Sequence, residues 1–258
     1  MTYRVGDEAK PGDVYVKGPV ELRCGSYQDV LGDVEPDAVI CDPPYSERTH
    51  DGHDVQVRNA RNEGLSVIRT KLCYSAWEEA QVNALVSWAP TGWLVAMSDH
   101  VMVPWYERAA LAAGRYSFAP VPWVAIGSRV RIVGDGPSCW TTQINVSRPR
   151  SEPWSRWGTL PGAYVVPSDR GNHIGGKPVA LMRALIRDYS RPGDLVCDPT
   201  AGGATTLIAA ALEGRRAIGA ELDPVTFAKA CARIERTALT APLPFCEASR
   251  MTQEGWDL

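Results

Sequence analysis

An acid, two prolines and an aromatic residue stand together at Asp42-Pro43-Pro44-Tyr45, directly after the apolar run Ala38-Val39-Ile40-Cys41. That run is typical of a buried parallel strand, so the four residues lie where a strand ends. Two consecutive prolines fix φ and remove two N–H donors, which leaves carbonyl oxygens on a stiff turn. An acid, a carbonyl and a ring can hold a planar amino group, because the oxygens accept its hydrogens and the ring covers its flat face. The turn is therefore the candidate catalytic site.

A second candidate site is the loop Asp198-Pro199-Thr200-Ala201-Gly202-Gly203-Ala204-Thr205-Thr206, which follows another apolar run and opens into a helix. Its glycines let a ligand approach the backbone closely, and the helix start offers free N–H donors. The next strand, over 216–220, ends at Glu221, where an acid can accept hydrogen bonds from both ribose hydroxyls. This order of strand, glycines, helix, strand and acid predicts a nucleotide-like cofactor.

With these two motifs the chain resembles the amino-methyltransferases that use S-adenosyl-L-methionine to methylate exocyclic amines in DNA. In that family D-P-P-Y is the catalytic motif, and the segment 198–206 is similar to the D-P-F-x-G-x-G-T-T cofactor loop. The segment 173–178, with His173, Lys177 and Pro178, resembles a third motif, H-x-x-x-K-P. The catalytic turn comes first and the cofactor loop last, which is the circularly permuted order of the β group. The resemblance spans about 20–237.

The resemblance implies S-adenosyl-L-methionine as cofactor, S-adenosyl-L-homocysteine as product and no metal. It assigns cofactor contacts to the loop 198–206 and to Glu221, and extends them to Lys177, His173, Asp223 and Asp42. Two of these keep an alternative: Lys177 as a solvated charge, and Asp223 as the residue that only starts a helix. The chain departs from the family at Gly25-Ser26, where Gly-Asp is usual, at Thr200, where an aromatic residue is common, and at Ala204, where glycine is common.

The same resemblance suggests a mechanism. Asp42 and the Pro43 carbonyl would accept the two amine hydrogens more strongly as positive charge develops on the nitrogen, while Tyr45 stacks on the base. The base is out of reach inside a duplex and must be flipped out. An Asp in this motif usually accompanies adenine N6 and a Ser usually accompanies cytosine N4. Adenine is therefore expected, with cytosine as the alternative.

The elements around these motifs alternate between strands and helices, which predicts a Rossmann-like α/β fold with a mostly parallel, seven-stranded sheet flanked by helices. We expect one catalytic domain over 1–258, a mobile loop over 46–72 near the active site and a small target-recognition insert over 127–172. Strands at about 116–126 and 142–148 are expected to form an antiparallel pair. Residues 1–19 predict an irregular arm or a short edge hairpin.

Composition sets the remaining bounds. The net charge is −3, so a nucleic-acid surface must be local. Seven scattered cysteines form no C-x-x-C pair, which argues against a zinc site or a disulfide framework. No long apolar stretch or signal core is found, so the expected location is the cytoplasm of a prokaryote or of a phage-infected cell, without a membrane partner.

Double-stranded DNA is the expected partner, and a homodimer and a cognate restriction endonuclease stay open. The insert carries six arginines against three acids, and the loop 46–72 adds further basic side chains. These side chains would contact phosphates, unless they are merely solvated. The candidate DNA contacts are Arg48, Arg58, Arg129, Arg131, Arg148 and Arg150.

Three other functions remain open. Protein glutamine methyltransferases use a related Asn-Pro-Pro-Tyr turn, but their cofactor loop comes first in the chain. An RNA adenine methyltransferase would share the same motifs. A non-catalytic DNA-binding relative is expected to have lost the acid, the double proline or the glycines, and this chain keeps all three.

Overall fold

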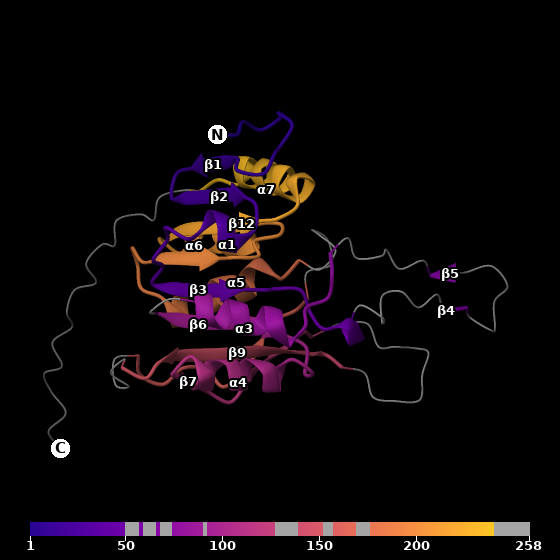
Figure 1. Ribbon diagram of the computed structural model, residues 1–258, viewed down its shortest axis with the longest axis vertical. Coiled ribbons are helices and arrows are strands. Elements are labelled where there is room, and N and C mark those ends of the chain that lie inside the picture. The colour runs from indigo at the N-terminus through magenta and orange to yellow at the C-terminus, as the bar shows by residue number, and fades with distance from the viewer. Residues whose placement is uncertain are drawn as a thin grey trace, which may run out of the picture.

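The computed structural model describes residues 1–49, 74–89, 92–126, 139–151, 157–168 and 176–239, and the backbone of 57–58 and 66–67. Most of these residues form a twisted sheet with helices on both faces (Figure 1). In the described part of the chain, the ten strands of the sheet are β1 (Val14–Lys17), β2 (Val20–Cys24), β3 (Ala38–Cys41), β6 (Trp93–Ser98), β7 (Arg115–Ser117), β8 (Val121–Val124), β9 (Thr141–Pro149), β10 (Tyr164–Val165), β11 (Leu195–Asp198) and β12 (Arg216–Glu221).

The sheet order is β1-β2-β12-β11-β3-β6-β9-β8-β10, with β7 also paired to β9. Strands β2, β12, β11, β3 and β6 run parallel, while β1 and β9 flank them in the antiparallel sense. The late strands β11 and β12 therefore lie between the early strands β2 and β3 (Figure 1). This arrangement places the end of the candidate cofactor strand beside the end of the candidate catalytic strand.

Helices cover the two faces in two sets. The helices are α1 (Tyr27–Val30), α3 (Glu79–Trp88), α4 (Val103–Ala112), α5 (Val179–Tyr189), α6 (Thr205–Leu212) and α7 (Pro224–Arg236). One hydrophobic cluster joins α5, α6 and α7 to the sheet, and a second joins α1, α3 and α4 to the other face (Figure 1). Burial on both faces explains why the central strands β3 and β6 read as unbroken apolar runs. None of the described helices has the length and apolar content to cross a membrane.

The Rossmann-like α/β class is confirmed, with two differences in detail. The described sheet has ten strands rather than seven, because β1, β7 and β10 extend or double its edges. The strand region expected at 116–126 is divided into β7 and β8, and both pair antiparallel with the long strand β9. The N-terminal arm forms the edge hairpin β1–β2, which is one of the two forms predicted for it.

The loop expected over 46–72 is described only in part. Its first residues, 46–49, follow the catalytic turn, and two short strands, β4 (Val57–Arg58) and β5 (Ser66–Val67), pair with each other in the antiparallel sense. The rest of this loop, and its predicted mobility, lie outside the described residues. The same holds for 127–138, 152–156 and 169–175, most of which belong to the expected recognition insert.

Candidate active site

Four acidic residues meet at one edge of the sheet because four neighbouring parallel strands end there. Asp42 follows β3, Asp198 ends β11, Glu221 ends β12 and Asp99 follows β6. The register is direct, since Cys197 pairs with Val39 on one side and with Ile218 on the other. The carboxyl ends of parallel strands are where α/β proteins bind their ligands. The two motifs, far apart in sequence, thus form one candidate site.

The catalytic turn holds its acid with two partners. The Tyr45 hydroxyl donates to Asp42 Oδ1 at 3.0 Å, and Lys177 Nζ forms an ion pair with Asp42 Oδ2. Lys177 Nζ also lies 5.0 Å from the centroid of the Tyr45 ring, within the range of a cation–π contact. Burial and the nearby Asp42 charge raise the pKa of Tyr45 well above its ordinary value, so the phenol stays a neutral donor. Lys177 was expected at the cofactor, and the structure places it on the catalytic acid.

Asp99 fixes the segment that follows the turn, a role that no sequence pattern indicated. Its Oδ2 accepts from the backbone N–H of Ser46 at 3.2 Å, from the Ser46 hydroxyl and from Thr49 Oγ1 at 2.7 Å. Its Oδ1 accepts from the N–H groups of Val101 at 3.1 Å and Met102 at 3.3 Å. Burial alone would raise the pKa of Asp99, but these hydrogen bonds outweigh it and the pKa is lowered. Asp99 therefore remains ionised and ties the chain after Tyr45 to the end of β6.

The acid of the cofactor loop, Asp198, is almost fully buried, with 2% of its surface exposed. Its Oδ1 accepts from the Thr200 N–H at 3.1 Å, and Thr206 donates a further side-chain hydrogen bond. Burial raises the pKa of Asp198 to about 7, opposed by these hydrogen bonds and assisted by the negative charges of Asp42 and Glu221. Among the described residues no ion pair of Asp198 is found. A buried acid in this state is suited to receive a positively charged ligand group.

Glu221 closes the loop from the next strand. Its Oε2 accepts from the Gly202 N–H at 2.8 Å, and its Oε1 accepts from the Asp223 N–H at 2.9 Å. Burial raises the pKa of Glu221, while these N–H groups lower it in part. Asp223 caps α7 by accepting from the Thr226 N–H at 2.9 Å, so the structure gives it the helix-starting role.

An apolar rim lies beside Glu221. Leu222, the next residue, is 70% exposed, and Val225 is 60% exposed at the start of α7. Sequence reasoning missed this rim, because two apolar residues at a helix start predict burial rather than exposure. Exposed side chains of this kind offer a surface on which a flat ring can pack.

Backbone shape explains two small residues of the loop. Ala204 has φ +60°, a left-handed conformation that costs a residue with a Cβ about 1 kcal/mol, which accounts for glycine being common there in the resembled family. Gly219 lies under the loop, where an added Cβ would lie 2.8 Å from the Asp198 carbonyl oxygen and 3.1 Å from Ala201 Cβ. Arg233 of α7 secures the helix start, donating to the Gly203 carbonyl at 2.6 Å and to Thr205 Oγ1 at 2.8 Å.

The candidate DNA contacts do not gather in one place. Arg48 is exposed beside the catalytic turn. Arg148 lies toward the other end of the sheet, because β9 runs against β6 and pairs Ser147 with Leu94 near the start of β6; Arg150 follows it. The Arg148 guanidinium contacts the rings of Tyr116 and Phe118 at 5.7 and 5.8 Å. The remaining predicted residues lie outside the described residues (His173, Arg129 and Arg131) or are described by backbone alone (Arg58).

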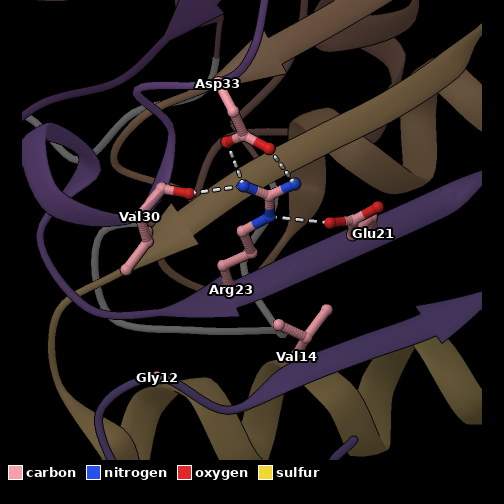
Figure 2. Close-up of a pocket in the computed structure, with 6 residues that line it drawn as sticks. All are labelled: Gly12, Val14, Glu21, Arg23, Val30 and Asp33. Atoms are coloured by element: carbon pink, nitrogen blue, oxygen red, sulfur yellow. Dashed lines mark hydrogen bonds and ion pairs between the residues drawn. The ribbon is translucent and has the colours of Figure 1, made fainter. Parts of the chain in front are cut away.

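A pocket between β1, β2 and the α1 region is separate from this site (Figure 2). In it Arg23 binds Asp33 through both terminal nitrogens, Glu21 through Nε at 2.7 Å and the Val30 carbonyl at 2.6 Å. Asp33 in turn has its pKa lowered by Arg23. This Arg23 cluster fastens the segment after α1 to β2. Its contacts are internal to the fold, and we assign it a structural role.

Comparison with known proteins gives the class to which this arrangement is similar. Residues 139–230 match the family model for DNA methylases. The type II methyltransferase M.BglI of Bacillus subtilis is 35% identical over 85 residues, which is 32% of this chain and 24% of that protein. The DNA adenine methyltransferase YhdJ of Escherichia coli K12 is 46% identical over 52 residues, 20% of this chain and 18% of that protein. The matched segments thus span about a quarter or less of these relatives.

Solved structures agree at the level of the fold. M1.HpyAVI superposes with a TM-score of 0.62 at 17% identity, covering 84% of this chain and all of that one. A DNA modification methylase of Thermus thermophilus, solved with S-adenosyl-L-methionine, gives 0.56 at 21% identity, covering 83% and 93%. The cytosine-N4-specific PvuII methyltransferase gives 0.55 at 18% identity, covering 89% of each chain. The family match thus confirms the resemblance to the DNA amino-methyltransferases, and the solved structures confirm the expected fold.

Proposed function

We propose that this protein is a site-specific DNA methyltransferase that transfers a methyl group from S-adenosyl-L-methionine to N6 of a flipped adenine in double-stranded DNA. The observation that carries the proposal is the juxtaposition of the Asp42-Pro43-Pro44-Tyr45 turn and the Asp198 loop at one edge of the sheet. The DNA methylase family match and the named methyltransferase relatives support the same reaction class. The reaction would take place where prokaryotic DNA lies, in the cytoplasm.

The residues of the Asp198 loop fit such a cofactor. Asp198 offers a buried carboxylate to the ammonium of the amino-acid end, and Glu221 offers oxygens to the ribose hydroxyls. Leu222 and Val225 present apolar surface beside Glu221 on which an adenine ring can pack. The glycines of the loop are only half-buried, so a ligand can reach their backbone. When bound, the cofactor supplies an electrophilic methyl group on a sulfonium.

The catalytic turn would act on the amine. Its nitrogen is a poor nucleophile because the lone pair is delocalised into the ring of the base. Asp42 and the Pro43 carbonyl would accept its two hydrogens, which favours a more tetrahedral nitrogen and stabilises the positive charge that develops during transfer. Tyr45 would stack on the base and hold it in line. Asp99 keeps the chain after Tyr45 in place, so it supports the turn without touching the base.

Cytosine N4 is the second candidate target. Asp42 at the head of the turn favours adenine, as does the resemblance to the Asp form of the motif, and YhdJ is named as an adenine methyltransferase. The PvuII structure, by its name, acts on cytosine N4 and shares the fold. The choice between these two amines rests on Asp42.

The test uses purified protein, S-adenosyl-L-methionine with a tritiated methyl group, and separate DNA and RNA substrates of mixed sequence. We expect label in DNA, recovered as N6-methyladenine after digestion to nucleosides. N4-methylcytosine would replace adenine by the second candidate, and label in RNA alone would replace DNA as the substrate. The absence of label from every substrate would contradict the proposal.

A further inference from the structure

Lys177 engages both chemical features of the catalytic turn at once. Its ammonium forms an ion pair with Asp42 Oδ2 and lies 5.0 Å from the centroid of the Tyr45 ring. The other carboxylate oxygen, Asp42 Oδ1, accepts from the Tyr45 hydroxyl. The lysine side chain is only 12% exposed and that of Asp42 is 23% exposed, so the pair is well shielded from water. In this arrangement the turn is closed on itself.

This closed turn conflicts with the reaction, if the proposed function is taken as the basis. A target amine needs an oxygen of Asp42 as acceptor, and a target base needs the face of Tyr45. Lys177 holds the first and contacts the second. A like charge is also unwelcome there, because both the bound cofactor and the methylated amine carry positive charge during transfer. Lys177 must therefore move before the base can be seated.

The position of Lys177 indicates where it can go. It precedes Pro178 and α5, and its four-carbon stem lets the ammonium move while the helix stays fixed. A shielded ammonium needs another anion when it leaves Asp42. The cofactor brings one, since its amino-acid end carries a carboxylate. The loop that would hold this end begins at Asp198, on the strand next to the catalytic strand.

We propose that Lys177 is a positioning residue that keeps Asp42 and Tyr45 closed in the free protein and releases them when the carboxylate of the cofactor draws its ammonium away. The catalytic acid is then available to a base only when the cofactor is in place. By reciprocity, the cofactor strengthens binding of the flipped base, and the base strengthens binding of the cofactor. The device prevents a base from being held unproductively in an empty enzyme.

Asp42 then competes with the cofactor for Lys177. Removing the charge in Asp42→Asn should therefore tighten binding of a ligand that carries the carboxylate. The probes are S-adenosyl-L-homocysteine, which keeps the carboxylate and has a neutral sulfur, and methylthioadenosine, which lacks the amino-acid end. Titration calorimetry on four proteins, wild type, Asp42→Asn, Lys177→Met and the double variant, gives a complete cycle. Lys10→Met, which removes an exposed lysine, is the charge-matched control.

We expect Asp42→Asn to bind S-adenosyl-L-homocysteine about three- to tenfold more tightly than wild type, a factor typical of a partly shielded ion pair. Methylthioadenosine affinity should not change. In the Lys177→Met background, Asp42→Asn should give no gain, whereas in the Lys10→Met background the gain should persist. Melting temperatures identify any variant that has lost its fold, and Lys177→Arg, which keeps the cation, should restore part of the coupling.

An equal or weaker affinity of Asp42→Asn for S-adenosyl-L-homocysteine would overturn the proposal, as would the same gain with and without Lys177. A protein that binds neither probe in its wild-type form would instead overturn the proposed function itself. Tight binding of both probes without coupling to Lys177 leaves the methyltransferase intact and removes only the gating role.

Discussion

Three aspartates at the sheet edge have the same side chain and three different environments. Asp42 is paired with a cation and a phenol, Asp198 is buried without an ion pair to any described residue, and Asp99 is surrounded by hydrogen-bond donors. The environments separate their proposed roles: Asp42 faces the reacting amine, Asp198 awaits a cationic ligand group, and Asp99 holds backbone in place. Their separation makes each role accessible to a single substitution.

Asp42→Ala removes the proposed acceptor for the amine. We expect methyl transfer to fall by about a hundredfold or more, as when one preorganised group at a developing charge is lost. Methylthioadenosine affinity should stay near the wild-type value, because the Asp198 loop is untouched. Single-turnover transfer of labelled methyl groups measures the first quantity and calorimetry the second. Glu47→Gln, at an exposed acid near the turn, is the control and should behave as wild type. Undiminished transfer by Asp42→Ala would remove this residue from the mechanism.

Asp198 predicts an unusual dependence of stability on pH. Its pKa in the folded chain is about 7, against an ordinary value of 3.8. Between these values the folded chain holds a proton that the unfolded chain has lost, so the free energy of unfolding falls as pH rises from about 4 to about 7. The contribution is on the order of a few kcal/mol. Urea unfolding at pH 5 and pH 8 should show a smaller fall in Asp198→Asn than in wild type. Identical falls in the two proteins would show that Asp198 titrates normally.

At the scale of elements, the site depends on contacts between a strand end and the loop beside it. Asp99 joins the end of β6 to the chain after Tyr45, and Gly219 of β12 leaves room for the Asp198 loop. Each contact positions a loop that carries chemistry on a strand that does not. Loops held in this way are set by neighbouring strands rather than by their own sequence.

Asp99→Ala should loosen the catalytic turn. The Ser46, Thr49, Val101 and Met102 donors lose their acceptor, which should cost about 2–3 kcal/mol of stability. Methyl transfer should fall at least about tenfold through misplacement of Tyr45, with little change in S-adenosyl-L-homocysteine affinity. Thermal unfolding and single-turnover kinetics measure the two effects, with exposed Asp29→Ala as control. Normal kinetics in a stable Asp99→Ala protein would refute the positioning role.

Gly219→Ala should damage the cofactor loop from below. The new Cβ would come within 3.1 Å of Leu207 Cδ1 and Ala201 Cβ and closer still to the Asp198 carbonyl oxygen, so the loop must shift. Overpacking of this kind costs about 1–3 kcal/mol, and the affinity for S-adenosyl-L-homocysteine should fall with it. Gly32→Ala is the matched control, since nothing lies within 4 Å of its added Cβ. Equal melting temperatures and affinities in the two variants would show that the space under the loop is not limiting.

Elements with a strong local pattern could be predicted from the sequence. The unbroken apolar runs of β3 and β11 and the proline before α5 indicated these elements within a residue or two. The division of 116–126 into β7 and β8 could not be predicted, because both pair with β9 and pairing is set by tertiary contacts.

In the site, Asp42, Asp198 and Glu221 could be predicted because each stands at the end of a strand at a recognisable spacing. The pairing of Lys177 with Asp42 and the clamp at Asp99 could not. Both join residues about 50 to 135 positions apart, and no local signal marks such a contact.

Over the whole molecule, the net charge of −3 leaves DNA binding to local surfaces. Arg48 lies beside the catalytic turn, whereas Arg148 lies toward the opposite end of the sheet, against Tyr116 and Phe118. The edge that carries the acids must also carry the phosphate contacts, because a flipped base can reach only a short distance from its backbone.

Arg48→Glu should therefore weaken DNA binding and lower the slope of log affinity against log salt by about one, the value for one lost phosphate contact. Arg216→Glu, at the start of β12 and so at the opposite edge, should leave both quantities unchanged. Fluorescence anisotropy with a duplex of mixed sequence at several salt concentrations gives both numbers. Equal effects of the two substitutions would mean that the site edge is not the DNA-binding edge.

The most direct measurement is mass spectrometry of nucleosides from the DNA of a methylation-free bacterial host that expresses the protein. We expect N6-methyladenine with the wild-type chain and none with Asp42→Ala. Methylated DNA that persists in Asp42→Ala cells, or no modified base with a stably folded wild-type protein, would contradict the proposed methyl transfer at Asp42.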